Sequence, residues 1–268
     1  MVHRLDDAGD SRLACYADLR WNSKAASGTR WFVVEGRLCV QRFLASDLDV
    51  HSVLVQQGSE KEVANWADEQ VPIYVLPKSQ ISELVGYEFH RGLLACGTRP
   101  NFLQLADLDW SRMTHPIVLG ALGIRERENL GSMLRTAAAM GIQDVLVEPG
   151  TADPFARRTI RVSMANVLKQ RLYHLGRPVQ ELGELASDGT VRMVAATLSD
   201  DAIPLDSWKP DGRPVVLLMG NEATGLDPAL ENIATEHVTI PMELGTDSLN
   251  VSVATGLCLY ELVKRCRP

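Results

Sequence analysis

The sequence predicts an α/β fold in two domains, and three observations support this prediction. Short apolar runs alternate with amphipathic stretches along the chain, as strands alternate with helices in α/β proteins. The apolar runs of the second half are nearly continuous, as expected for parallel strands covered on both faces. The periodicity lapses around Pro100, Asn101 and Pro116, which places a domain boundary there. The predicted division is a domain at 1–105, a linker at 106–114 and a domain at 115–268.

The first domain is expected to be a small, mostly parallel sheet with helices packed against it. A helix is predicted at 36–46, with Leu38, Phe43 and Leu44 near one face. A charged helix around Trp66 and another short helix separate the later strands. The predicted strands are 31–35, 52–56, 72–76 and 92–96.

The second domain repeats the alternation more strongly, with five strands and five helices. The expected strands are 117–121, 144–148, 191–196, 215–219 and 237–240. The expected helices are 128–140, 154–169, 179–187, 228–234 and 249–264.

Composition limits the class of protein. The 268 residues are 46% hydrophobic and carry a net charge of −7, which excludes an intrinsically disordered chain. The acidic balance alone argues against a nucleic-acid partner, because phosphate binders are usually basic. The N-terminus lacks the apolar core of a signal peptide, and no apolar run approaches the ~20 residues that span a bilayer. The five cysteines have wide spacings and no CxxC pair, so we expect a reducing cytosol, no disulfide framework and no metal site.

Three segments carry the residue types of a functional site. The first runs from Arg125 to Gly141, directly after a predicted strand. Asn129 is placed to cap the following helix, and Arg135 lies in an otherwise apolar stretch of it. Taken alone, this segment favours a simple helix cap and a solvated surface arginine.

The second segment, from Leu218 to Leu226, follows a buried strand. It places Glu222 at the carboxyl end of that strand, which is the edge where open α/β sheets bind ligands. Gly220 permits close backbone approach there. The alternative is an ordinary loop into a helix that Asp227 caps and Pro228 begins.

The third segment, from Ile240 to Gly256, leads from a strand into the C-terminal helix. Ser248 is a plausible N-cap. Asn250 and Ser252 are less expected in the first turn of an apolar helix, because short polar side chains compete with helical hydrogen bonds. Their presence suggests a site.

Taken together, the three segments resemble the SpoU/TrmH family of SPOUT RNA methyltransferases. The shared motifs are N-x-G-x-x-x-R-T-A, then G-x-E-x-x-G-L, then I-P-M…S-L-N-V-S, in this order. Residues 33–36 and 92–95 are similar to the L30e-like substrate-binding domain of two-domain members. The resemblance implies an α/β SPOUT domain with a deep trefoil knot, preceded by a small L30e-like α/β domain. Where the family usually has Gly-Ala after Ser-Met, this chain has Ala165 and Asn166.

The resemblance also implies a reaction and a site. Family members transfer a methyl group from S-adenosyl-L-methionine to a ribose 2′-oxygen of RNA. An arginine pKa above ~12 makes a base role for Arg135 difficult, so phosphate gripping and oxyanion stabilisation come first. The implied catalytic set is Asn129, Arg135, Glu222, Ser248 and Asn250. The implied cofactor pocket is lined by Thr197, Gly220, Ile240, Met242 and Leu249.

The charges are unevenly distributed along the chain, so an acidic protein can still offer basic stretches to RNA. Residues 157–177 contain six basic residues and no acid, whereas residues 178–261 contain three basic residues and fourteen acids. Residues 19–43 carry a net +4, and Trp21, near Lys24, is a candidate for stacking on unpaired bases, whereas Trp31 is expected in the core. Salt-sensitive RNA binding is therefore expected.

The expected protein is a cytoplasmic homodimer, not bound to a membrane, that methylates large-subunit ribosomal RNA. Transfer RNA is the alternative substrate. A non-catalytic RNA-binding protein on the same scaffold and a small-molecule enzyme stay open as other classes.

Overall fold

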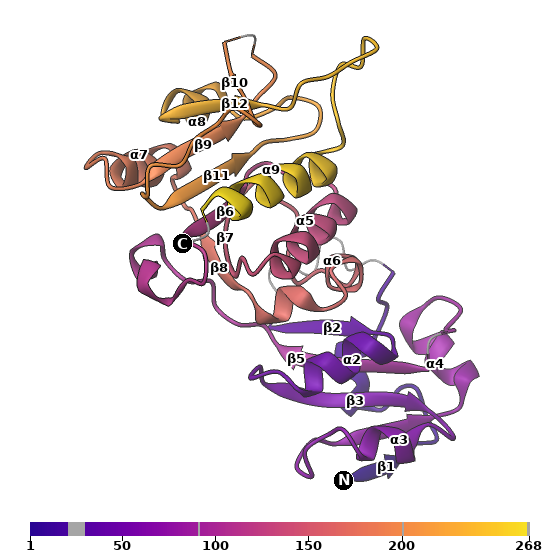
Figure 1. Ribbon diagram of the computed structural model, residues 1–268. Coiled ribbons are helices and arrows are strands. Elements are labelled where there is room, and N and C mark those ends of the chain that lie inside the picture. The colour runs from indigo at the N-terminus through magenta and orange to yellow at the C-terminus, as the bar shows by residue number, and fades with distance from the viewer. Residues whose placement is uncertain (21–29, 91, 200, 267–268) are drawn as a thin grey trace. The chain divides into compact units, whose positions relative to one another are not determined.

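The computed structural model describes residues 1–20, 30–90, 92–199 and 201–266, which form two compact units. The first unit contains Met1–Asn101 and Asp153–Lys169, and the second contains Phe102–Ala152 and Gln170–Pro268 (Figure 1). The chain thus changes unit at residue 101, close to the expected boundary. Residues 153–169, which the sequence assigns to the second domain, pack with the first unit. Trp21 and Lys24 lie outside the described residues.

The first unit is built on a five-stranded sheet with the strand order β1-β4-β3-β5-β2. β1–β4 and β3–β4 are parallel, but β5 runs antiparallel to both of its neighbours, so the sheet is mixed rather than mostly parallel. Strands that are buried on both faces do not encode their direction, which explains the difference from the prediction. The strands are β1 (Val2–Arg4), β2 (Trp31–Glu35), β3 (Val50–Gln56), β4 (Ile73–Leu76) and β5 (Leu93–Thr98).

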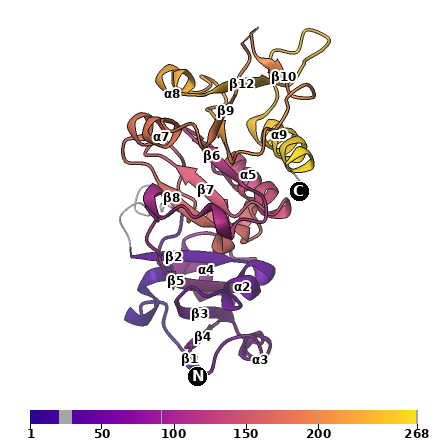
Figure 2. The ribbon, with the colours of Figure 1, turned by 60° about the vertical axis from the view of Figure 1, so that its left-hand side comes forward.

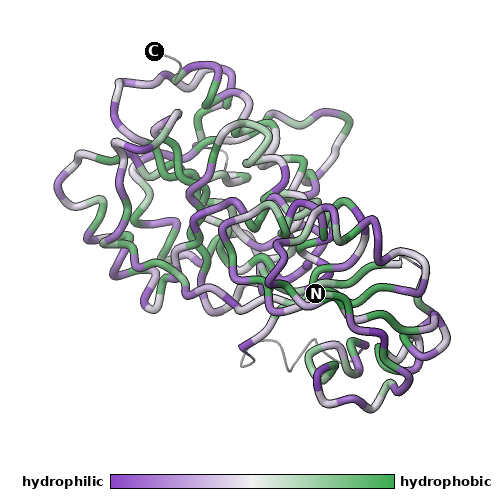
Figure 3. The backbone as a smooth tube through the Cα atoms, turned by 90° about the horizontal axis from the view of Figure 1, so that it is seen from below, coloured by the Kyte–Doolittle hydropathy of each residue, from purple (hydrophilic) through white to green (hydrophobic). Residues whose placement is uncertain are grey.

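Short helices flank this sheet. Most of the strands themselves are long hydrophobic runs, coloured green in Figure 3. One cluster of its buried side chains includes Tyr16, Leu54, Phe89 and Leu94. Trp31, which the sequence predicts in the core, is only partly buried and packs against this cluster. Among the described residues before Phe102, the helical elements are η1 (Ser11–Tyr16), α2 (Arg37–Leu44), α3 (Glu60–Ala64) and α4 (Lys78–Val85).

Charged side chains fasten Asp153–Lys169 to the first unit. Arg99 forms a bidentate pair with Asp153, with N–O distances of 2.7 and 2.8 Å. Arg157 Nη1 lies 2.6 Å from the buried Glu35 carboxylate. Bidentate and buried ion pairs of this kind hold fixed geometries. Arg157, one of the basic residues expected for RNA contact, therefore also holds the fold.

The predicted helix at 154–169 is interrupted in the structure. It consists of α6 (Arg157–Val162) and a 3-10 turn, η5 (Asn166–Lys169). Between them Met164 and Ala165 have φ values of 52° and 61°, in the left-handed region that breaks a helix. Ala165 thus takes a conformation that glycine adopts more easily, at the position where the resembled family usually has glycine.

The second unit contains a seven-stranded, fully parallel sheet with the order β10-β12-β9-β11-β6-β7-β8. The five predicted strands are confirmed to within one residue at each end. Two short edge strands, β8 and β10, were not predicted. The strands are β6 (Ile117–Ala121), β7 (Asp144–Val147), β8 (Arg171–His174), β9 (Arg192–Ala196), β10 (Ile203–Pro204), β11 (Val215–Met219) and β12 (Glu236–Thr239).

Helices cover both faces of this sheet (Figure 2). α7 and α8 pack together on one face, where Leu182 and Leu230 meet Val216 and Leu218 of β11. α5 and α9 pack together on the other face. The α/β prediction is thereby confirmed, while the trefoil knot and the L30e-like character of the first unit stay predictions. The helices are α5 (Arg127–Ala139), α7 (Pro178–Ala186), α8 (Pro228–Asn232) and α9 (Val251–Arg265), with 3-10 turns η3 (Leu105–Asp107) and η4 (Trp110–Arg112) before β6.

Of the three N-cap residues that the sequence predicts, one is confirmed and two are wrong. Asp227 caps α8 through a 2.8 Å bond from Ala229 N, with Pro228 in the first turn, as the sequence predicts. Asn129 does not cap α5, which begins after Glu126. α9 is capped by Asn250 rather than by Ser248. Asn129 therefore lies within α5, and Asn250 takes the cap position that the sequence assigns to Ser248. No helix in the described part of the chain is long and apolar enough to cross a membrane.

Candidate active site

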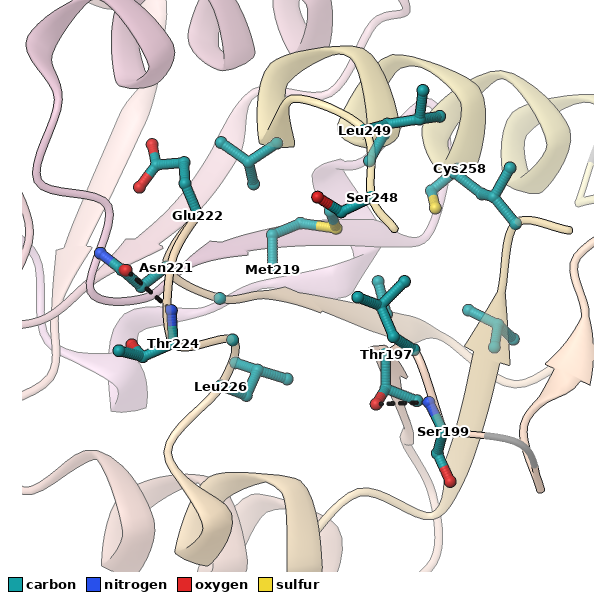
Figure 4. Close-up of a pocket in the computed structure, with 18 of the residues that line it drawn as sticks. Thr197, Ser199, Met219, Asn221, Glu222, Thr224, Leu226, Ser248, Leu249 and Cys258 are labelled. Atoms are coloured by element: carbon teal, nitrogen blue, oxygen red, sulfur yellow. Dashed lines mark hydrogen bonds between the residues drawn. The ribbon is translucent and has the colours of Figure 1, made fainter. Parts of the chain in front are cut away.

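A cavity of about 710 Å³ lies in the second unit, at the carboxyl ends of β9, β11 and β12 (Figure 4). These three strands are neighbours in the sheet, so the loops that follow them meet at one edge. The volume falls in the range of ~300–1,000 Å³ that is usual for small-molecule sites. The edge of the sheet predicted from Glu222 is the edge that holds the cavity.

All five residues predicted to bind the cofactor line this cavity. Two follow β9 and β11 directly, two belong to the loop after β12, and one precedes α9; they are Thr197, Gly220, Ile240, Met242 and Leu249. Other apolar lining comes from Met219, Leu226 and Val251. Figure 4 shows Thr197, Met219 and Leu249 around the open space. The walls are thus largely apolar, with backbone groups of the three loops between them.

The loop after β11 has a shape that requires glycine at 220. A Cβ atom added there would overlap the backbone N of Leu226 and would lie 2.6 Å from the carbonyl oxygen of Gly225. Asn221 N and Gly225 N each donate to the other residue's carbonyl oxygen at 2.9 Å, which closes the loop on itself. The Asn221 side chain completes the loop by accepting from Ala223 N at 2.9 Å and Thr224 N at 3.2 Å. The cavity wall is therefore a tightly bonded turn.

Asn250, Asn129 and Glu222 form a row of hydrogen bonds at this site. Asn250 Nδ2 donates to Asn129 Oδ1 at 2.9 Å, and Asn129 Nδ2 donates to Glu222 Oε1 at 2.5 Å. Ser252 N donates to Asn250 Oδ1 at 2.9 Å, and a backbone N–H can only donate. The backbone of Ser252 thereby fixes the orientation of the Asn250 amide, and Asn250 fixes that of Asn129. The row of donors ends at the carboxylate of Glu222, which lines the cavity. The three sequence motifs meet in this row.

Ser248 and Arg135 complete the predicted catalytic set in different ways. Ser248 lines the cavity beside Leu249. Arg135 is exposed on α5 and is not among the lining residues. Within the described part of the chain it forms no hydrogen bond or ion pair, so its guanidinium is available to a ligand. The structure therefore unites four of the five predicted catalytic residues and leaves Arg135 apart.

Sequence reasoning missed several cavity residues with polar or reactive groups, including Glu231 and Cys258. Glu231 of α8 accepts a 2.7 Å hydrogen bond from the Thr197 hydroxyl. Cys258 of α9 also lines the cavity, and burial raises the pKa of its thiol to about 12. A thiol with that pKa stays protonated and is no nucleophile. Neither residue has a motif of its own, because Glu231 and Cys258 lie on helices whose sequence reads as ordinary amphipathic structure.

Among the described residues, the lining contains three carboxylates, Glu222, Glu231 and Asp247, and no basic side chain. The cavity is therefore suited to a ligand with positive charge. RNA phosphates would need cationic side chains from outside this lining.

Comparisons with known proteins agree with this geometry. The sequence model of the SpoU rRNA Methylase family matches residues 116–260. An uncharacterised tRNA/rRNA methyltransferase of Mycobacterium bovis is 31% identical over 97% of this chain and 91% of its own length. The 23S rRNA (guanosine-2′-O-)-methyltransferase of Acinetobacter baylyi is 30% identical over 70% of this chain and 76% of its own.

A solved structure shares the whole fold. The AdoMet-bound rRNA methyltransferase of Sinorhizobium meliloti has a TM-score of 0.83 and 24% identity, and the match covers 98% of both chains. The family match covers more than half of the chain, and it includes all three motifs that meet at the cavity. The chain therefore belongs to the SpoU rRNA methylase family.

Proposed function

We propose that this protein transfers a methyl group from S-adenosyl-L-methionine to a ribose 2′-hydroxyl of RNA. The observation that carries the proposal is the hydrogen-bonded row Asn250–Asn129–Glu222 at the cofactor-sized cavity. The Acinetobacter relative, which carries a 2′-O-methyltransferase name, supports the ribose oxygen as the target.

The cavity fits this cofactor in two respects. Apolar walls from Met219, Ile240 and Leu249 suit an adenine ring and a methionyl chain. The carboxylates of Glu222, Glu231 and Asp247 complement a sulfonium and an ammonium group.

When bound, S-adenosylmethionine supplies a methyl group that is already activated for transfer. The protein then has to align the ribose oxygen and assist the loss of its proton. Asn129 donates to the Glu222 carboxylate and is itself oriented by the amide of Asn250, so the row holds the carboxylate in one orientation. Ser248, on the cavity wall, is placed to orient the hydroxyl.

Arg135 is assigned to the RNA. Its exposed guanidinium offers a planar pair of donors that match a phosphodiester next to the target ribose. In that position it also stabilises the negative charge that develops on the 2′-oxygen. A base role for Arg135 comes second, because a guanidinium rarely gives up its proton.

Large-subunit ribosomal RNA is the proposed substrate, supported by the Acinetobacter relative's name. Transfer RNA is the alternative. The basic residues of 157–177 supply cationic groups that the acidic cavity lacks.

We also propose a cytoplasmic homodimer. Exposed apolar side chains follow one face of α9 at helical spacing, namely Val253 (51% exposed), Leu257 (44%) and Tyr260 (60%). A contiguous exposed apolar face of this kind is typical of an interface.

The test combines binding, transfer and mapping. Calorimetry with S-adenosylmethionine should show one site per chain, and radiolabelled methyl should pass to ribosomal RNA from a deletion strain. Mapping of 2′-O-methyl positions in ribosomal and transfer RNA then identifies the substrate. Absence of cofactor binding would favour a non-catalytic RNA-binding protein, and methyl transfer without RNA would favour a small-molecule enzyme.

A further inference from the structure

Three side chains of the first unit with metal-ligating atoms gather at one point. Their ligand atoms lie within 4.8 Å of one another; the residues are Cys15, His51 and Cys96. They come from η1, β3 and β5, and are 36 and 45 residues apart in the sequence. No spacing motif marks them, which is why the sequence predicts no metal site. The methyltransferase cavity lies in the other unit and uses none of them.

A β-bulge brings His51 into this cluster. In the β3–β5 ladder Val50 pairs with Gly97 and Ser52 pairs with Cys96, so His51 is the additional residue. In a regular strand His51 and Ser52 would point to opposite faces. Here His51 Nδ1 lies 3.0 Å from Ser52 Oγ, on the same side as the residue paired with Cys96. Bulges characteristically redirect one side chain in this way.

The surroundings hold the three residues in place. The Tyr16 hydroxyl, fully buried next to Cys15 in the chain, donates to the Ser52 carbonyl oxygen at 2.9 Å. The Trp31 ring packs on the His51 ring with a centroid distance of 4.4 Å. Cys96 is fully buried, while Cys15 and His51 are partly accessible. The cluster is therefore held in place by its neighbours and is partly open at Cys15 and His51.

Thiolate and neutral imidazole are the forms that bind metals, so uptake of an ion would release the thiol protons of Cys15 and Cys96. Two thiolates balance the charge of a divalent cation.

We propose that Cys15, His51 and Cys96 form a zinc-binding site that fastens η1 to the sheet of the first unit. Two sulfurs and one imidazole nitrogen are a donor set that zinc prefers. Two ligand atoms of one tetrahedral zinc ion lie about 3.3–3.8 Å apart, given metal–ligand bonds of ~2.0–2.3 Å. The ligand atoms of the cluster, now within 4.8 Å of one another, would therefore move closer together by up to about 1 Å on binding the ion. Solvent reaches Cys15 and His51 and supplies the fourth ligand.

The test uses the full-length, chelator-treated protein and Co²⁺ as a spectroscopic probe. We expect one Co²⁺ per chain with thiolate-to-cobalt charge-transfer bands, which Zn²⁺ abolishes by displacement. Cys15→Ser and Cys96→Ser should remove these bands, and His51→Gln should weaken Zn²⁺ binding about 100-fold. Cys39→Ser is the matched control, since Cys39 is a buried cysteine of the same unit that lies outside the cluster.

A second measurement needs no variant that might fail to fold. Zn²⁺ should slow the alkylation of Cys15 in the wild-type chain and leave Cys266, a similarly accessible free thiol, unchanged. Equal protection of both thiols, absence of the charge-transfer bands, or bands that survive both serine variants would overturn the proposal. Isolation of a Cys15–Cys96 disulfide that forms in place of zinc uptake would overturn it as well.

Discussion

The side-chain amide of Asn250 donates to Oδ1 of Asn129 at 2.9 Å, joining two helices across 121 residues of sequence. The same Asn250 caps α9 with its own oxygen. One side chain thus serves both the start of a helix and the orientation of a proposed catalytic row, and substitutions can separate the two roles.

Asn250→Asp should keep the cap and disturb the row. The aspartate still accepts from Ser252 N, so thermal stability should change little, but it cannot donate to Asn129. We expect methyl transfer to fall about 10–100-fold, because misplaced catalytic groups have effects of that size. Asn250→Ala should lose the row and also about 1 kcal/mol of stability. Thermal unfolding and single-turnover transfer measure the two effects, and equal activity of Asn250→Asp and wild type would refute the role of the row.

Gly220→Ala should abolish cofactor binding. Its methyl group would meet the backbone of Leu226 and Gly225, which cannot move without opening the loop. Calorimetry with S-adenosylmethionine should show at least about a 100-fold loss of affinity, in line with the steep cost of close contacts at fixed backbone. Gly183→Ala on α7 is the control, because the added methyl group would have no atom outside its own helix within 4 Å. This variant should bind S-adenosylmethionine with wild-type affinity.

Arg135→Ala should remove methyl transfer while cofactor binding persists. The residue lies outside the cavity lining, so S-adenosylmethionine should bind with wild-type affinity. Arg135→Lys keeps the charge but not the bidentate fork and should retain only part of the activity. The test is the rate of methyl transfer to RNA at saturating S-adenosylmethionine. Wild-type activity of the Arg135→Ala variant would be incompatible with the role assigned to Arg135.

Glu148→Gln should stabilise the protein at neutral pH. Burial raises the pKa of Glu148, and the Asp227 carboxylate raises it further. The folded state then holds this proton to a higher pH than the unfolded chain, whose pKa is near 4.5, so stability is lost as the pH rises through that window. Glutamine does not titrate, and its advantage should vanish below about pH 4. Denaturant unfolding between pH 4 and 8 tests this, with the exposed Glu184→Gln as a variant that should show no such trend.

Leu257→Glu should dissociate the proposed dimer. It places a charge in the middle of the exposed apolar face of α9. Sedimentation should change from dimer to monomer, whereas Val179→Glu, at an exposed apolar site on α7, should leave the wild-type state unchanged. A wild-type monomer at micromolar concentration would contradict the proposal.

The sequence predicted most of the second unit because buried parallel strands are continuous apolar runs. β11 was placed to the residue on that basis. β8 was missed because Arg171 begins it, and the charge is compensated by a side chain of β7, Asp144, at 2.6 Å. Such pairing between distant segments leaves no trace in local periodicity.

The cofactor residues were predicted by resemblance, and the cavity brings all five together. The role of Asn129 could not be assigned from local pattern, since it looks like a helix cap, whereas Asn250 suggested a site because it was not expected in the first turn of a helix. The gathering of Cys15 and His51 was equally hidden, because a bulge is a property of strand register and not of spacing.

The division of the chain between its two units has a consequence for protein synthesis and for engineering. The first unit needs residues 153–169, which the ribosome makes only after 51 residues of the second unit, 102–152. The first unit therefore cannot be completed before synthesis of the second has begun. A gene fragment that stops near residue 101 lacks the partners of Glu35 and Arg99, and exchanging the first unit between relatives requires two cuts in the gene as well as the junction at 101.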